Sequence, residues 1–417
     1  MILNNRFVPM NLRRILFIVT YVLAISTVKA QILTKEDSLA ANLNFKSNTS
    51  VLSGYGEVFA NVNGRYGTGT VNVERMVMFF GHRFNQNFQF FSELELEDAI
   101  VGNGRAGAFS LEQMVLKMNL NRQHYLLAGL YIPRLGIVNE NHLPTTFNGN
   151  QRNRIETMVI PTTWRDLGVC LYGQSYAIPG LNYTVGISNG MNAENMNYSS
   201  GIRGGRFNGS MASTKNIALN ASLLQYYRNF RFQLAGYYGG SNRFGTIESD
   251  SIGLKAGVFS NPIALGDFNV QYLGKRFTAK ALATYISIKD AQFINRAFGK
   301  NLAKSMYGAY VEGAYNLLKP VEGDLFSKQL WLFSRVEQLN LNYKIAENGI
   351  YDDFMNQFSV TSGVTYKPTP GVAIKFDWQY LHTGDRNMAL HVVNPFDPQR
   401  PFYNNNHFFN LGLAYSF

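Results

Sequence analysis

The sequence ends in His407-Phe408-Phe409-Asn410-Leu411-Gly412-Leu413-Ala414-Tyr415-Ser416-Phe417. Apolar or aromatic residues occupy every second position from Phe409 to Phe417, and small or polar residues occupy the positions between them. A period of two with one apolar face and one polar face predicts a β-strand that separates two unlike environments. The rest of the chain should supply the environments that this strand separates.

The composition favours a β-protein with an apolar outside and a polar inside. Charged residues make up 16% of the 417 residues, below the roughly 25% that is usual for soluble domains. Aromatic residues make up 14%, with 31 Phe and 24 Tyr. The competing interpretation, a soluble aromatic-rich β-sandwich, would need more charge on its surface. The terminal strand resembles the closing strand of bacterial outer-membrane β-barrels, and this resemblance implies that Tyr415 and Phe417 form the assembly signal.

The first thirty residues have the pattern of a cleaved signal peptide. Arg13 and Arg14 precede an apolar run over 15–25, which is too short to span a membrane, and small residues follow at Val28 and Ala30. We therefore expect a signal peptide over 1–30 and a periplasmic N-terminal extension over 31–53. The single Cys170 excludes an internal disulfide and a cysteine metal site. The six histidines are scattered, so we expect no metal site and no cofactor.

Residues 54–417 read as one antiparallel transmembrane β-barrel of about sixteen strands. Short turns such as 85–86, 121–122 and 228–229 alternate with long connections, as they do between the periplasmic and external ends of such barrels. The count rises to eighteen if residues 252–259 also form a strand. The predicted strands are 54–63, 70–82, 86–97, 111–119, 124–131, 165–173, 180–189, 214–226, 229–240, 267–273, 276–288, 304–316, 329–340, 356–366, 371–382 and 406–417.

Alternation within these strands indicates which side chains line water. A charged side chain cannot face lipid, because Arg or Lys costs about 2–4 kcal/mol at the bilayer midplane. A register error of one residue would turn each of them to the lipid. The predicted pore-wall residues are Arg231, Arg335, Lys375, Glu93, Glu95 and Asp377.

The third external connection, residues 132–164, is the longest and is predicted to fold into the lumen as a constriction loop. It is basic, and rings of Arg or Lys favour anions. In the alternative interpretation, its arginines pair with Glu140, Glu156 and Asp166, or bind lipopolysaccharide phosphates. The predicted constriction residues are Arg134, Arg152, Arg154, Arg165, Glu156 and Asp166.

Two motifs around this connection resemble the porin O/P family, the phosphate-selective-porin-like proteins. The first is Gly129-Leu130-Tyr131-Ile132-Pro133-Arg134-Leu135-Gly136-Ile137, and the second is Trp164-Arg165-Asp166-Leu167-Gly168-Val169. The Asn- and Tyr-rich style is similar to a Bacteroidetes-type member. The resemblance implies a Gram-negative outer-membrane porin. The predicted lumen carries both signs of charge, whereas phosphate-selective members carry dense Lys and Arg ladders.

We therefore expect an outer-membrane porin for passive diffusion of small hydrophilic, and in part anionic or phosphate-like, solutes. The expected partners are outer-membrane lipid, lipopolysaccharide, the barrel assembly machinery and these solutes, and nucleic acid is not among them. Analogy with sixteen-stranded porins implies a homotrimer. One alternative is a non-conducting barrel that acts in adhesion or in a secretion complex. Another is a barrel enzyme, but no Ser–His pair supports it, so catalysis is not expected.

Overall fold

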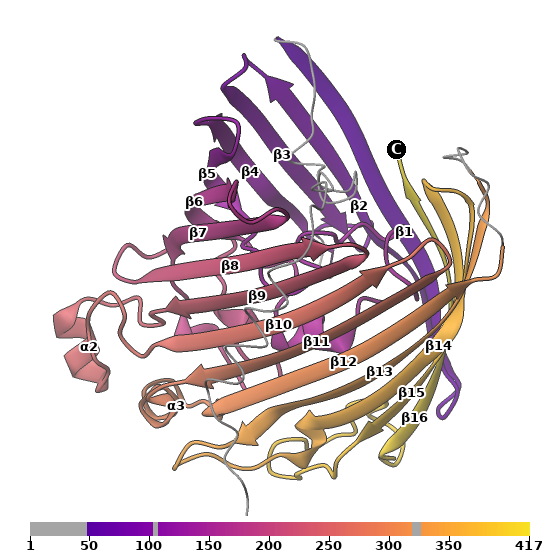
Figure 1. The fold of residues 1–417 in the computed structure, drawn as a ribbon. Coiled ribbons are helices and arrows are strands. Elements are labelled where there is room, and N and C mark those ends of the chain that lie inside the picture. Colours follow the sequence, from indigo (N-terminus) through magenta and orange to yellow (C-terminus); the bar gives the residue numbers. More distant parts are fainter. Residues whose placement is uncertain (1–47, 103–106, 319–326) are drawn as a thin grey trace, which may run out of the picture.

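The computed structural model of the protein describes residues 48–102, 107–318 and 327–417. Within them, sixteen antiparallel strands pair in chain order, and the first strand pairs with the last to close a barrel (Figure 1). The prediction of an all-β antiparallel barrel of about sixteen strands is confirmed. The predicted signal peptide 1–30 and most of the predicted extension 31–53 lie outside the described residues.

The strands are β1 (Thr49–Asn63), β2 (Thr68–Arg83), β3 (Phe88–Glu97), β4 (Phe109–Asn119), β5 (His124–Tyr131), β6 (Asp166–Gln174), β7 (Leu181–Asn189), β8 (Ile217–Tyr227), β9 (Phe230–Gly239), β10 (Ile263–Leu273), β11 (Phe277–Ile288), β12 (Ser305–Asn316), β13 (Gln329–Lys344), β14 (Asn356–Thr369), β15 (Val372–Thr383) and β16 (Asn405–Ser416). The helices are the π-helix η1 (Ile155–Val159), the 3-10 helices η2 (Ala193–Asn195), η3 (Arg203–Gly205) and η4 (Asp353–Met355), and the α-helices α2 (Thr246–Ile252) and α3 (Ala291–Phe298). None of the helices in the described ranges is both long enough and apolar enough to cross a membrane.

Each of the sixteen predicted segments overlaps an observed strand, but several ends differ. β1 begins at Thr49 rather than at 54, because its ladder with β2 continues to the pair Thr49 and Arg83. The suggestion that residues 252–259 form a further strand is wrong. α2 ends at Ile252, Gly253 follows in the left-handed conformation with φ of 72°, and the next residues stay outside the sheet. The barrel therefore has sixteen strands rather than eighteen.

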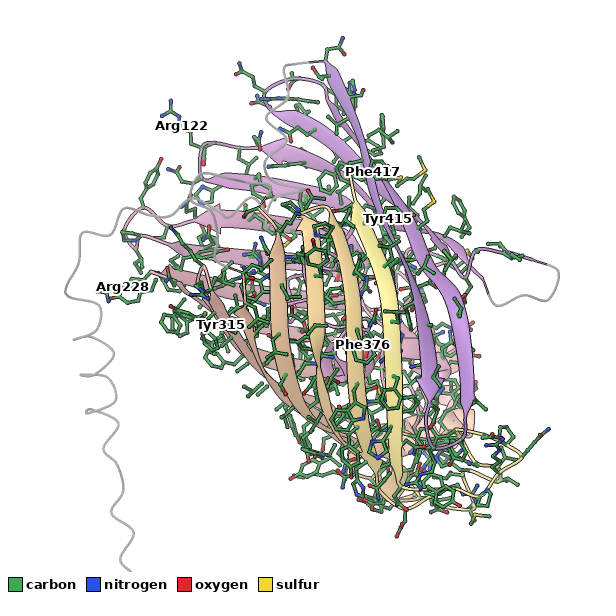
Figure 2. The ribbon with its side chains drawn as sticks, turned by 90° about the vertical axis from the view of Figure 1, so that its right-hand side faces the viewer. Arg122, Arg228, Tyr315, Phe376, Tyr415 and Phe417 are labelled. Atoms are coloured by element: carbon green, nitrogen blue, oxygen red, sulfur yellow. The ribbon has the colours of Figure 1, made fainter. Side chains whose placement is uncertain are left out.

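The alternation of side chains separates the two faces of the wall. In β15, Lys375 and Asp377 point inward and are buried, whereas Ile374 and Phe376 point outward and are exposed. Figure 2 shows Phe376 on the outer side of the wall, and Arg122 and Arg228 at short turns. Apolar residues also dominate the outer positions of other strands, for example Leu411 in β16. This outer face is built to meet lipid, and the chain is a membrane-spanning barrel of the outer-membrane type.

The strand that opened the sequence analysis closes the barrel. β16 pairs with β1 from the couple Tyr55 and Ser416 to the couple Asn63 and Phe408. Beyond the end of β16, the Phe417 N–H donates to the Gly54 carbonyl over 2.9 Å, and the Gly54 N–H donates to the Phe417 carbonyl over 3.1 Å. The described wall thus has no open sheet edge, which removes the unpaired backbone groups that a bilayer cannot satisfy.

The main hydrophobic core lies inside the barrel and on one side of it. It joins the segment between β5 and β6 to inward-facing apolar residues of β8–β13. Leu135, Ile155 and Trp164 of that segment are fully buried in it. Gly308 in β12 provides the necessary space, because a Cβ atom there would lie 2.8 Å from a methyl carbon of Ile155 and 3.1 Å from one of Val159. A second, smaller cluster includes Phe79 and Phe91.

Candidate functional site

The long segment between β5 and β6, residues 132–165, has partners on opposite sides of the wall. Its Thr163 hydroxyl donates to Glu112 of β4 over 2.6 Å. Its Asn148 amide donates to Glu312 of β12 over 3.0 Å. β4 and β12 are eight strands apart in a ring of sixteen. Further hydrogen bonds join the segment to β10, β13, β15 and β16.

Glu156 organises the inner turn of this segment. Its carboxylate is fully buried and accepts the backbone N–H groups of Ile137 and Val138, the latter over 2.6 Å. It also accepts the Asn153 amide over 2.8 Å and the Tyr310 hydroxyl over 2.9 Å. The residue that the sequence placed at a constriction is thus the acceptor that holds the turn together.

Asp166, at the start of β6, has a similar anchoring environment. It accepts the Trp164 indole N–H over 3.0 Å and the Ser188 hydroxyl over 3.3 Å. Among the described residues, no arginine forms an ion pair with Glu156 or Asp166. The two acidic residues of the predicted constriction therefore support the segment and form no ion pair with its arginines.

Glu140 lies between two arginines. The Arg134 guanidinium and the Arg231 guanidinium each donate to one oxygen of its carboxylate. Arg134 and Glu140 belong to the segment and Arg231 belongs to β9, so this triad fixes the segment to the wall. Burial by itself would raise the pKa of Glu140, but the positive charges of Arg134 and Arg231 outweigh it and lower that pKa.

The remaining predicted arginines of the segment bond to neutral acceptors. Arg152 donates to the His142 carbonyl over 3.4 Å, Arg154 donates to the Gln357 side chain, and Arg165 donates to the Ser110 hydroxyl over 3.2 Å. None of the three has a salt-bridge partner among the residues that the structure describes. The guanidinium groups of these three predicted residues are therefore positioned by neutral oxygen atoms.

Two further arginines join them from the connection between β7 and β8. Arg203 donates to the carbonyls of Thr157 and Thr162, and Arg206 donates to those of Pro161 and Thr163. Burial and the like charges of Arg203 and Arg165 lower the pKa of Arg206 to about 9. Like charges therefore repel one another here, and an anion would relieve that repulsion.

Arg152, Arg154 and Arg203 line a cavity of about 290 Å³. Its charged lining residues are four arginines and three glutamates, which leaves one excess positive charge. Arg75, one of the four, is itself paired with Glu57 over 2.8 Å, Glu95 over 3.1 Å and Glu74 over 3.4 Å. An adjacent cavity of about 380 Å³ shares the lining residues Gln151, Arg154 and Met158. The charged lining residues of the first cavity are Glu57, Glu74, Arg75, Glu97, Arg152, Arg154 and Arg203.

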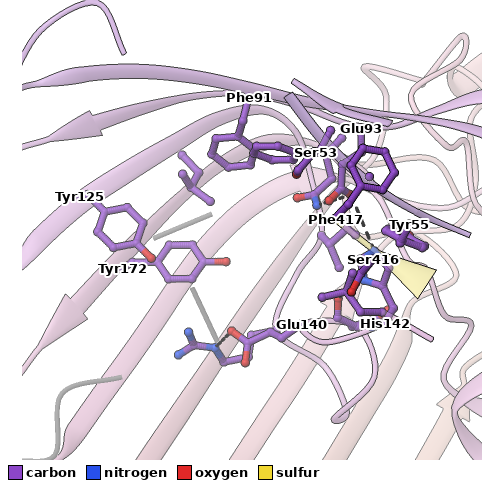
Figure 3. Close-up of a pocket in the computed structure, with 18 residues that line it drawn as sticks. Ser53, Tyr55, Phe91, Glu93, Tyr125, Glu140, His142, Tyr172, Ser416 and Phe417 are labelled. Atoms are coloured by element: carbon purple, nitrogen blue, oxygen red, sulfur yellow. Dashed lines mark hydrogen bonds and ion pairs between the residues drawn. The ribbon is translucent and has the colours of Figure 1, made fainter. Parts of the chain in front are cut away.

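A third cavity, also of about 290 Å³, lies toward the ends of β1 and β16 that meet at Gly54 and Phe417 (Figure 3). Its lining is mainly aromatic and apolar, and its charged or titratable lining residues include Glu93, Arg134, Glu140 and His142. Tyr125 and Tyr172 stack there with ring centroids 4.9 Å apart. The segment 132–165 contributes residues to the lining of this cavity and to the arginine-lined one.

All six predicted wall residues lie on the inward face and are buried. Most of them anchor the segment or other charges. Lys375 donates to the Gly149 carbonyl over 2.8 Å, and Asp377 accepts the Asn150 backbone N–H over 2.7 Å. Arg335 lies 3.1 Å from both Glu312 and Glu337. Among the other wall residues, Arg231 pairs with Glu140 and Glu95 pairs with Arg75. Glu93 accepts a hydrogen bond from Gln113.

Several residues of the site were not found from the sequence. Arg75 shares the inward face of β2 with Val77 and Phe79, and its alternation was a usable signal. Arg203 and Arg206 lie in a Gly-rich stretch, and nothing local indicates that it reaches segment 132–165. Glu112 points inward because the β3–β4 ladder is irregular at Glu93. It joins Glu93 and His142 in a group whose side-chain atoms could hold a metal ion.

Comparison with known proteins supports the fold of this chain and does not assign it to a family. No family model matches the chain. An uncharacterized protein of Aquifex aeolicus (strain VF5) is 27% identical over 344 residues, which cover 78% of this chain and 74% of that protein. This identity is too low to show a shared family.

Three solved structures are similar over most of their length. Salmonella typhi OmpF in complex with daunomycin matches with a TM-score of 0.56 and 10% identity, over 89% of this chain and 98% of that one. The outer-membrane channel DcaP of Acinetobacter baumannii matches with 0.52 and 13%, over 89% and 99%. OmpT of Vibrio cholerae matches with 0.50 and 10%, over 90% and 99%. The protein therefore shares the fold of these outer-membrane proteins and channels.

Proposed function

We propose that this protein is an outer-membrane channel through which small hydrophilic solutes diffuse passively, and that residues 132–165 form its constriction. The observation that carries the proposal is the path of this segment, which hydrogen-bonds to β4 on one side and β12 on the other. A segment that contacts opposite sides of a barrel narrows the lumen through which a solute must pass. No covalent step is part of this function.

The packing of the segment favours a passage on one side of the lumen. Its apolar residues, including Ile155 and Trp164, pack against β8–β13. Toward β1–β3 and β14–β15 the segment instead borders the two adjacent cavities, whose linings include charged and amide side chains such as Arg75, Gln151 and Gln357. Water and polar solutes would follow this polar side, because apolar core packing excludes them.

The arginines support a preference for anions. Arg152, Arg154, Arg165, Arg203 and Arg206 bring five positive charges together, and the described residues supply no carboxylate within ion-pair distance of any of them. In a confined space with low-dielectric walls, such charge attracts anions more strongly than it would in bulk water. Phosphate-like solutes, and membership of the porin O/P family with a Bacteroidetes-type origin, remain parts of this proposal.

A trimer is also proposed. The trimer form of Vibrio cholerae OmpT has a TM-score of 0.50 with this chain and covers 89% of it. The outer face of the barrel offers both lipid and a second copy an apolar surface, with exposed residues such as Val311 and Leu332. Outer-membrane lipid and lipopolysaccharide would cover what a partner copy does not. Outer-membrane insertion would use the barrel assembly machinery and the signal at Tyr415 and Phe417.

Planar-bilayer recording of the purified full chain tests the proposal. We expect open-channel current, and in a salt gradient a reversal potential that indicates anion preference. Replacing residues 145–151 with two glycines should raise the conductance, because this stretch carries the tip of the segment. The matched control is an equal shortening within 245–251, an external connection that lines neither of these cavities and should leave the conductance unchanged. Cation preference would contradict the arginine argument.

The alternative is a non-conducting barrel that serves in adhesion or in a secretion complex. The observation in its favour is the dense packing inside the barrel, where Trp164 and Ile155 are fully buried. The connection between β7 and β8, residues 190–216, would then offer the contact surface. If neither the intact chain nor the 145–151 variant carries current, this alternative replaces the channel.

A further inference from the structure

Three metal-ligating side chains meet inside the barrel although they come from distant parts of the sequence. Glu93 belongs to β3, Glu112 to β4, and His142 to the segment 132–165. One ligand atom from each lies within 4.8 Å of the other two. The His142 Nε2 atom is 3.7 Å from a Glu93 oxygen and 3.8 Å from a Glu112 oxygen. All three residues are more than nine-tenths buried.

The orientation of His142 makes this group more than a cluster of acids. Its Nδ1 atom lies 3.2 Å from the Asn139 carbonyl oxygen. A carbonyl oxygen only accepts hydrogen bonds, so the Nδ1 atom carries the hydrogen. In the neutral ring the Nε2 lone pair then faces the two carboxylates, at distances too long for hydrogen bonds. A histidine that donates from one nitrogen to a carbonyl and offers the other to a cation has the arrangement of a metal ligand.

The carboxylates are also held in place by donors. Glu93 accepts the Gln113 amide over 2.8 Å. Glu112 accepts the Thr163 hydroxyl over 2.6 Å and the Tyr55 hydroxyl over 3.3 Å. These contacts use part of each carboxylate and fix its direction, as outer-shell partners do around metal ions. The bulge in β4 turns Glu112 inward toward His142.

We propose that Glu93, Glu112 and His142 bind a divalent first-row metal ion such as Zn²⁺, which ties the segment 132–165 to β3 and β4. Two carboxylates and one imidazole are a donor set that suits such ions. Ligand distances of about 2.0–2.2 Å require donor atoms no more than about 4.4 Å apart. The two nitrogen–oxygen distances meet this limit, and the two carboxylate oxygens, which lie within 4.8 Å of one another, need to approach by at most about 0.4 Å. The site does not depend on which solute the channel carries.

The surroundings leave a coordination position open. Glu93 and His142 both line the third cavity, which lies beside them (Figure 3). Water or a small solute donor there can complete the coordination of the ion. Arg152 contacts the His142 backbone carbonyl and brings one positive charge close, so with His142 neutral, as a metal ligand requires, the two glutamates and this arginine sum to −1. A divalent cation is favoured by the remaining negative charge.

The test uses the full chain in detergent after removal of metal with a chelator. Calorimetry with Zn²⁺ should give one bound ion for each chain, and Co²⁺ should give visible absorption bands. His142→Ala and Glu112→Gln should each weaken Zn²⁺ binding at least tenfold. Glu93→Gln provides a third variant that keeps its partner Gln113, so a folding failure in one variant leaves the test standing. In single-channel records, Zn²⁺ but not Mg²⁺ should reduce brief closures.

The matched control is His391→Ala, because His391 pairs with Asp352 over 2.7 Å and has no second carboxylate in this pairing. Zn²⁺ binding should be unchanged in this variant. Absence of a bound ion in the wild-type chain overturns the site, as does equal Zn²⁺ affinity in folded Glu93→Gln and wild type. Equal losses in the His391 and His142 variants overturn it too.

Discussion

Replacing Glu140 with Gln should destabilise the barrel and loosen the constriction segment. The Glu140 carboxylate contacts both the Arg134 and the Arg231 guanidinium, and the side chains of the two arginines are only 8% and 4% exposed. Removing one partner of a buried ion pair typically costs about 3–5 kcal/mol, since the remaining charge stays away from water. We expect the free energy of unfolding to fall by about 3 kcal/mol, the lower end of this range, because Gln keeps a hydrogen-bond acceptor at this position.

The free energy of unfolding can be measured by urea titration of the barrel in lipid vesicles, with tryptophan fluorescence as the signal. The control is Glu194→Gln, which removes the partner of Arg243 in a pair whose side chains are about 40% exposed. Exposed pairs contribute at most about 1 kcal/mol. A loss below about 1 kcal/mol for Glu140→Gln would refute the claim that this triad anchors the segment. Single-channel records of the same variant should show more frequent current fluctuations.

Three other outcomes follow from the same geometry. Gly308→Val should cost about 1–3 kcal/mol in unfolding free energy, because the new side chain would clash with Ile155 and Val159 of η1. The control Gly266→Val should be close to neutral, because no heavy atom lies within 4 Å of the Cβ position there. Tyr310→Phe removes one of the hydrogen bonds to the buried Glu156 carboxylate and should cost about 1.5–3 kcal/mol in the same titration. The double change Arg203→Gln and Arg206→Gln should move the reversal potential toward cation permeation, and the loss of hydrogen bonds to the carbonyls of segment 132–165 should also lower the unfolding free energy. An unchanged potential would remove these residues from the selectivity argument.

The charges inside the barrel divide into two groups with different tasks. One group is compensated, as in Arg335 between Glu312 and Glu337. These residues hold the wall and the segment together. The other group contains arginines such as Arg152 and Arg203, which bond to neutral carbonyl oxygens. A backbone carbonyl fixes the position of a guanidinium but leaves its charge, and the proposed anion preference rests on this second group.

The sequence alone was sufficient to predict the strands of the barrel wall and the face on which their alternating side chains lie. The side-chain period of a strand is two, so a single alternating stretch such as 409–417 reports which face meets lipid. The same local rule placed Lys375 and Asp377 on the inward face of β15. Short and long connections alternate because one end of such a barrel has short turns and the other has long loops, and this pattern is also local.

The tertiary structure decided what the inward side chains do. Whether an arginine is neutralised depends on residues that are distant in the sequence, as Arg231 of β9 and Glu140 show. No local pattern could bring Arg206 to the carbonyl of Thr163, or His142 to Glu93 and Glu112, because these contacts require a closed wall and a segment that runs inside it. Alternation reports the face on which a side chain lies, and only the closed barrel determines its partner.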